Sequence, residues 1–210
     1  MTMETDVKNS RYYLNRELSW LQFNKRVLQE AVDTSNPLLE KLKFLAITSS
    51  NLDEFFMIRV AGLKHQKENG VKRRDIANMT PTEQLENISD ACQKLVAQQY
   101  MHLKGILKEL ETEGLVFIKP TDADERQKQW MGNYFEREIF PVVTPMAVDS
   151  SHPFPFLASK SLNLAMLLEK NERDEEMDEE NDIDVKTAIV PVPSVLPRII
   201  RLPDVSEANS

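Results

Sequence analysis

The spacing of apolar residues changes at Gly114, and this change constrains the fold of the 210-residue chain more than any other feature. Before Gly114, apolar residues recur every three or four positions, which is the period of amphipathic helices. After Gly114, short apolar runs alternate with proline-containing stretches, as is typical of strands and loops. We therefore predict an α+β protein, with a helical bundle over residues 1–114 and a partial α+β domain over residues 115–210.

Start signals predict the first three helices. Asn15 caps the first, RELSWLQFNKRVLQEAVD. Asn36 caps the second, and Pro37 occupies its first position, where no amide hydrogen is needed. A third helix is expected to begin inside SSNLDEFFMIRVAGLK (49–64), because three capping residues precede two acidic residues there.

The fourth predicted helix is the longest. Thr80, Pro81 and Glu83 have the spacing of a capping box with proline at the first helical position. The helix is expected to end at Gly114, after an apolar stripe with spacings of three and four that includes Leu85, Ile88, Cys92, Leu95, Ile106 and Leu110. This stripe predicts that the helix packs along the other three in one bundle.

Shorter elements are predicted after Gly114. The segment LVFIKP (115–120) has the composition of a strand, and a helix is expected to start at Thr121. Residues 140–160 contain four prolines and are predicted to form no regular element. Further strands are expected at residues 161–170, 186–193 and 198–203. So few strands and an open end predict that this domain is truncated and that the chain is part of a longer protein.

Composition excludes several classes of protein. The net charge of -8 argues against nucleic-acid binding, which needs a basic surface. Much of the acidic excess lies in residues 169–186, and the composition of residues 171–184 predicts a solvated loop. One cysteine, Cys92, permits neither an intrachain disulfide nor a CxxC site. Because no apolar stretch is long enough for a signal peptide or a transmembrane segment, we expect a cytoplasmic protein.

No catalytic or metal-binding constellation is visible in the sequence. His65, His102 and His152 fall in three different predicted elements, and each has an ordinary structural explanation. Neither GxGxxG nor GxxxxGK[ST] occurs. We therefore assign no catalytic residue and no metal ligand to this chain.

Asn51 is the candidate binding residue, and two interpretations of it are open. In the first, Asn51 caps the third helix and Glu54 completes a capping box. In the second, Ser50 is the cap with Asp53 as its partner, and the amide of Asn51 is free. An amide carries a donor and an acceptor side by side, which matches the edge of an adenine. Arg59, two turns further along, is either an ion-pair partner or a phosphate contact.

Three segments of the chain resemble the N-terminal part of the type 1 polyphosphate kinases: NRELSWLQFNKRVLQEA, NPLLEKLKFLAITSSNLDEFFMIRVAGLK and HPFPFLASKSLNLAMLL. The resemblance extends from Tyr12 to about Leu202 and is weakest at residues 171–184. It implies a helical N-terminal domain at residues 1–114, followed by a head domain at residues 115–210 that is truncated here.

The resemblance also implies a function. Type 1 polyphosphate kinases transfer the terminal phosphate of ATP reversibly to inorganic polyphosphate, through a phosphohistidine and with magnesium. The catalytic histidines and the magnesium site of the family lie in C-terminal domains, so this chain alone is expected to be inactive. Asn51 matches the asparagine that contacts the ATP base, and the head domain implies a homo-oligomer. The alternative is a stand-alone helical interaction module that binds no nucleotide.

Overall fold

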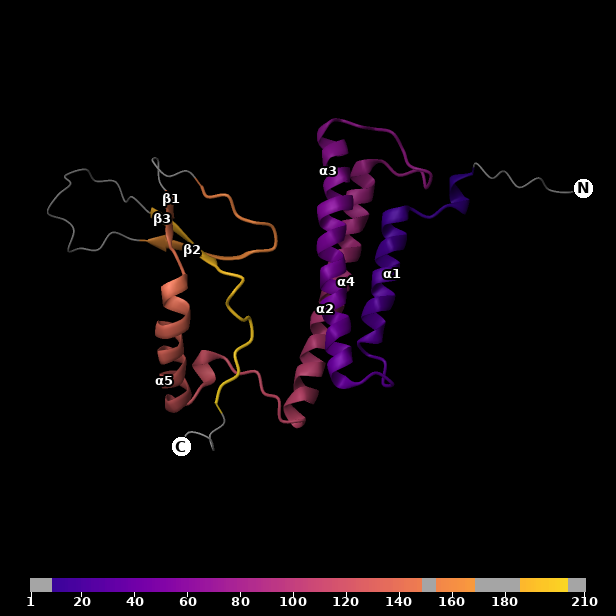
Figure 1. Ribbon diagram of the computed structural model, residues 1–210. Helices are drawn as coiled ribbons and strands as arrows, with labels where there is room; N and C mark the ends of the chain where they lie inside the picture. Colours follow the sequence, from indigo (N-terminus) through magenta and orange to yellow (C-terminus); the bar gives the residue numbers. More distant parts are fainter. Residues whose placement is uncertain (1–8, 149–153, 169–185, 204–210) are drawn as a thin grey trace, which may run out of the picture. The chain divides into compact units, whose positions relative to one another are not determined.

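The computed structural model describes residues 9–148, 154–168 and 186–203, and the chain divides into two compact units between Phe117 and Ile118. The first unit is helical, whereas the second contains one longer helix and a three-stranded sheet (Figure 1). This arrangement confirms the predicted fold class, a helical region followed by a partial α+β region.

Helices make up nearly all regular structure of the first unit. Figure 1 shows its long helices lying side by side. None of the helices in the described part of the chain is both long and apolar enough to cross a membrane. The elements are η1 (Ser10–Tyr12), α1 (Arg16–Glu30), α2 (Leu38–Phe55), the π turn η2 (Phe56–Val60), α3 (Ala61–Glu68) and α4 (Pro81–Thr112).

The predicted start of α1 is confirmed, but that of α2 is wrong by one residue. Asn15 caps α1, and its side chain accepts a hydrogen bond from a first-turn amide at 2.9 Å. α2 begins at Leu38, so Pro37 stands at the cap position and makes no side-chain bond there. Asn36 instead donates to the carbonyl oxygen of Glu30 at 2.8 Å, because the end of α1 has carbonyls that lack helical partners.

The predicted helix break at residues 49–51 is wrong. α2, η2 and α3 form one continuous rod over residues 38–68, which contains a single π turn in place of a break (Figure 1). Ser50 and Asn51 therefore lie inside a helix and cap nothing. The apolar residues on both sides of them are buried against neighbouring helices, and this tertiary burial outweighs local capping signals.

α4 begins and ends as predicted. The hydroxyl of Thr80 accepts from the amide of Glu83 at 3.3 Å, and the Glu83 carboxylate accepts from the amide of Thr80 at 2.7 Å. The Thr80 amide, and then the Thr80 hydroxyl, donate hydrogen bonds to the Glu83 carboxylate; these bonds, and then the nearby charge of Arg74, hold the pKa of Glu83 below its usual value. Gly114 follows the helix with a φ of 85°, a left-handed conformation that favours glycine.

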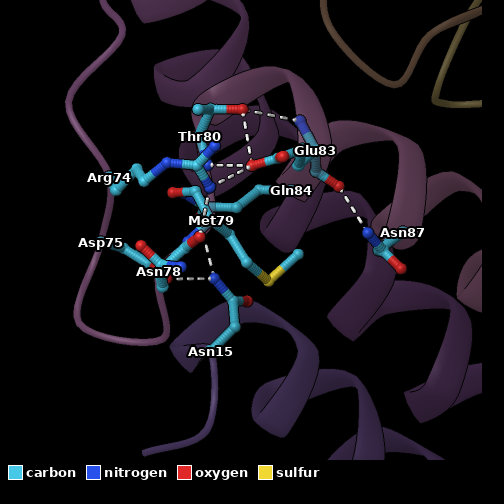
Figure 2. A network of polar contacts seen from close by, with 9 residues as sticks. All are labelled: Asn15, Arg74, Asp75, Asn78, Met79, Thr80, Glu83, Gln84 and Asn87. Atoms are coloured by element: carbon cyan, nitrogen blue, oxygen red, sulfur yellow. Dashed lines mark hydrogen bonds and ion pairs between the residues drawn. The ribbon is translucent and has the colours of Figure 1, made fainter. Parts of the chain in front are cut away.

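A network of hydrogen bonds joins the cap of α1 to the start of α4 (Figure 2). The Nδ2 of Asn15 donates to Asp75 Oδ2 at 2.7 Å and to Gln84 Oε1 at 2.9 Å. Gln84 in turn donates to the carbonyl oxygen of Met79 at 3.2 Å. Asn15 and Gln84 are buried, so these bonds replace their lost contacts with water and fix α1 against α4.

The core of the first unit lies where α1, α2, α3 and α4 meet. Burial raises the pKa of the Cys92 thiol to about 11, so Cys92 stays protonated at neutral pH and packs as a small apolar residue. The stripe predicted on α4 is buried at Ile88, Cys92, Leu95, Ile106 and Leu110.

Thr80→Ala is expected to destabilise the first unit by about 1 kcal/mol, because the substitution removes the cap of the longest helix. Urea unfolding followed by far-ultraviolet circular dichroism measures the change. Thr112→Ala, at the other end of α4, is the control, since the Thr112 hydroxyl is exposed and, among the described residues, bonds only the carbonyl of Glu109. Equal losses of stability in Thr80→Ala and Thr112→Ala would contradict a capping role for Thr80.

The second unit contains short helical pieces and one antiparallel sheet. β3 is the central strand, paired with β1 on one side and with β2 on the other. β2 and β3 confirm the strands predicted near residues 161–170 and 186–193. The elements are η3 (Pro120–Asp122), α5 (Glu125–Tyr134), η4 (Phe135–Ile139), η5 (Phe140–Val142), β1 (Met146–Val148), β2 (Leu162–Leu168) and β3 (Lys186–Val192).

Four other predictions for the second unit are wrong. Residues 115–120 and 198–203 form no strand, because no described strand pairs with them. Asp124, not Thr121, caps α5, since a carboxylate placed one residue before the helix reaches its first-turn amides. The segment with four prolines does contain β1, which is short enough to fit between them. The acidic segment 171–184 and His152 lie outside the described residues.

Candidate functional site

Asn51 is half-buried in the rod formed by α2, η2 and α3, on the side that faces α1. Its Nδ2 donates a hydrogen bond to Oδ1 of Asn24 at 2.9 Å. Asn24 is fully buried, with 0% of its surface exposed, and its own Nδ2 donates to the carbonyl oxygen of Thr48 at 3.1 Å. A chain of hydrogen bonds therefore runs from the backbone of α2 through α1 and back to Asn51.

This chain of bonds occupies only one side of the Asn51 amide. In the described part of the chain, Oδ1 of Asn51 accepts no hydrogen bond, and Nδ2 retains one N–H beyond the bond to Asn24. The amide can therefore offer an acceptor and a donor to a ligand. Of the two sequence interpretations, the capping role is wrong for Asn51, and Ser50 does not cap either. The amide is available because Asn51 lies inside a helix, where no helix-start amide needs a cap.

Arg59 is exposed on η2, eight positions after Asn51. In a regular α-helix the two side chains would point about 80° apart. A π turn holds one more residue than an α turn, so the eight positions span about two whole turns and Arg59 lies on a similar side to Asn51. Among the described residues, no acidic side chain forms an ion pair with Arg59.

Phe55 lies one turn after Asn51 and fixes α2 against α1. Its ring is stacked on Trp20, with centroids 4.5 Å apart and planes 5° apart. Before Asn51 in the same helix, Gln99 of α4 donates to the carbonyl of Leu45 at 2.8 Å and to the hydroxyl of Ser49 at 2.7 Å. α2 is thus fixed before and after Asn51.

Asn24 and Thr48 were missed by the sequence reasoning. One signal was available: Asn24 follows Leu21 by three residues and precedes Leu28 by four, so it lies on the apolar stripe of α1. A polar residue at such a position is buried and needs a hydrogen-bond partner. Its partners on α2 could not be identified, because the register of two helices depends on their packing.

The two histidines among the described residues, His65 and His102, lie in different helices. His65 lies in the last turn of α3, where its ring is 3.1 Å from the side-chain nitrogen of Asn69, and His102 is half-buried on α4. Within residues 9–148, 154–168 and 186–203, no three His, Cys, Asp or Glu side chains come together as a metal site would require. The candidate site therefore consists of Asn51, its support, and Arg59.

A groove of about 1040 Å³ lies between the rod and α4, but neither Asn51 nor Arg59 lines it. Apolar side chains such as Leu52, Phe56 and Val60 form most of its wall, with Lys64 and Lys67 at one end. The groove and the candidate amide therefore belong to different surfaces of the rod.

Comparison with known families assigns both units. The sequence model of the polyphosphate kinase N-terminal domain matches residues 13–118, and that of the polyphosphate kinase middle domain matches residues 126–210. The chain belongs to the polyphosphate kinase family. The resemblance found in its sequence is thereby confirmed.

Relatives in the polyphosphate kinase family match almost the whole chain. A polyphosphate kinase of Synechocystis sp. is 46% identical and one of Bacillus anthracis is 48% identical, each over 200 residues. These alignments cover 95% and 94% of this chain, but only 26% and 28% of the relatives. The chain thus spans about a quarter of the length of the curated relatives.

A solved structure supports the same assignment. The crystal structure of polyphosphate kinase from Porphyromonas gingivalis superposes with a TM-score of 0.72 at 31% sequence identity. The superposition covers 91% of this chain and 27% of that protein. The fold of this polyphosphate kinase chain is therefore that of the corresponding part of a solved relative.

Proposed function

We propose that this chain is the N-terminal part of a kinase that moves the terminal phosphate of ATP reversibly onto inorganic polyphosphate. The family membership and the names of the relatives support this proposal. Because the chain spans about a quarter of those relatives, the rest of such a protein would supply the histidine that carries the phosphate. This chain would supply part of the nucleotide site.

In this proposal Asn51 contacts the adenine base. The observation that carries it is the one-sided support of the amide: Asn24 binds Nδ2, while Oδ1 accepts no bond from the described residues. Arg59 would contact a phosphate of the same nucleotide. Two helical turns separate the residues by about 11 Å along the axis, a distance that the extended sugar and phosphates of ATP can cover.

Magnesium is not assigned to residues of this chain. Within the described residues no three His, Cys, Asp or Glu side chains come together, and in this proposal the rest of the kinase holds the ion. We further propose that residues 1–114 act as the N-terminal domain and residues 115–210 as part of a head domain that forms a homo-oligomer. The lone Cys92 suits a cytoplasmic protein.

Phosphorylation by ATP labelled at its terminal phosphate tests the proposed function. The full-length kinase that carries this chain is expected to acquire an acid-labile label in the presence of magnesium, because its remaining part holds the nucleophile. The 210-residue chain alone is expected to stay unlabelled. Acid-labile labelling of His65, His102 or His152 in the chain alone would show that it contains a nucleophile after all.

A further inference from the structure

We infer that Asn24 is a positioning residue that turns the Asn51 carbonyl toward the nucleotide and so selects a 6-aminopurine over a 6-oxopurine. The inference rests on the proposed function, in which Asn51 contacts the base. The proposed site otherwise consists of Asn51 on α2 and Arg59 on η2. The inference adds Asn24 on α1 and gives a reason for base selectivity.

The carbonyl of Thr48 fixes the orientation of the Asn24 side chain. A backbone carbonyl can only accept, so the side-chain atom of Asn24 that lies 3.1 Å from the Thr48 oxygen is the Nδ2 donor. Thr48 is fully buried inside α2, and its hydroxyl also bonds the carbonyl of Phe44 at 2.8 Å. The Thr48 carbonyl is therefore held in place, and the opposite orientation of Asn24 would bring two oxygens together where both residues are fully buried.

Asn24 in turn fixes the orientation of the Asn51 amide. Because Nδ2 of Asn24 is committed to Thr48, Oδ1 of Asn24 faces Asn51 and requires a donor. Only Nδ2 of Asn51 can donate, so Oδ1 of Asn51 points away from Asn24. Rotating the Asn51 amide by half a turn would place the two side-chain oxygens against each other and leave the buried acceptor of Asn24 unsatisfied.

The orientation of the Asn51 amide decides which base it complements. Adenine has an amino donor at position 6 beside a ring-nitrogen acceptor, whereas a 6-oxopurine has an oxygen acceptor at that position. The Asn51 amide complements adenine, because its Oδ1 can accept from the amino group and its remaining N–H can donate to the ring nitrogen. The same amide would face the position 6 oxygen of hypoxanthine with its own oxygen. A freely rotating amide would serve both bases, so the selectivity depends on Asn24.

Binding of ATP and ITP to the full-length kinase tests this inference. The wild type is expected to bind ATP about tenfold more tightly than ITP, because ITP leaves an acceptor facing an acceptor. In Asn24→Leu the ratio of the two affinities is expected to fall to about twofold, since Asn51 can then rotate. Asn15→Leu is the matched control: it removes another buried asparagine, in the network that joins α1 to α4, and should preserve the tenfold ratio while also lowering stability.

Each outcome separates this inference from the proposed function. If Asn51→Ala weakens ATP binding but Asn24→Leu keeps the wild-type ratio, positioning by Asn24 is overturned and the adenine contact stands. If Asn51→Ala leaves ATP binding unchanged, the adenine contact itself fails. If Asn24→Leu does not fold, Asn24→Ala takes its place in the same comparison: a fall of the ATP-to-ITP affinity ratio to about twofold supports the inference, and an unchanged ratio of about tenfold overturns it.

Discussion

Replacing Phe55 by alanine is expected to destabilise the helical unit by about 3–5 kcal/mol. The Phe55 side chain is only 2% exposed, so its removal leaves a cavity between α1 and α2. The variant also loses the stacked contact with Trp20 and the edge contact with Phe56, whose ring centroid lies 6.0 Å away. Urea unfolding followed by circular dichroism measures this loss as a lower transition midpoint.

Two further variants make the Phe55 experiment specific. Phe56→Ala removes the next aromatic ring in the chain, but that ring is 43% exposed, so the expected loss of stability is clearly smaller. Phe55→Leu retains much of the apolar volume, and its effect is expected to lie between those of the two alanine variants. A loss below about 1 kcal/mol for Phe55→Ala would show that the stack with Trp20 contributes little to the packing of α1 on α2.

Replacing Asn51 by alanine in the full-length kinase is expected to raise the Kd for ATP by about tenfold to a hundredfold. The substitution removes one donor and one acceptor and leaves the polar edge of the base unpaired, which costs about 1–3 kcal/mol. Isothermal titration with ATP measures the change. Some loss of folding stability is also expected, because Oδ1 of the buried Asn24 loses its donor.

Ser50→Ala is the matched control for Asn51→Ala. Ser50 precedes Asn51 in the same helix and is exposed, and since α2 continues through it, the Ser50 hydroxyl caps no helix start. We expect little change in either stability or ATP affinity for this variant. Unchanged ATP affinity in Asn51→Ala, together with reduced stability, would limit Asn51 to a structural role in holding Asn24.

Local signals predicted much of the helical unit from sequence alone. The cap at Asn15, the capping box of Thr80 and Glu83 and the end of α4 at Gly114 were all predicted. Such features depend on hydrogen bonds within a few residues, so sequence spacing is enough to identify them. The apolar stripe of α4 was predicted for a similar reason, since helical period alone places its members on one face.

Only the tertiary structure decided the features that depend on distant partners. Residues 49–51 carry the local signals of a helix start, yet burial of the flanking apolar residues between α1 and α4 makes one rod of α2, η2 and α3. LVFIKP (115–120) has the composition of a strand, but strand formation needs a pairing partner, and no described strand provides one.

The same division applies to the candidate site. The sequence by itself determined only that an asparagine occurs at position 51, with an amide that either caps a helix or stays free, and that an arginine follows at position 59. The packing of α1 on α2 decided how that amide is held, because Asn24 is 27 residues away in the chain and meets Asn51 only in the folded unit. The π turn decided where Arg59 lies, since one extra residue per turn changes the direction of every side chain after it.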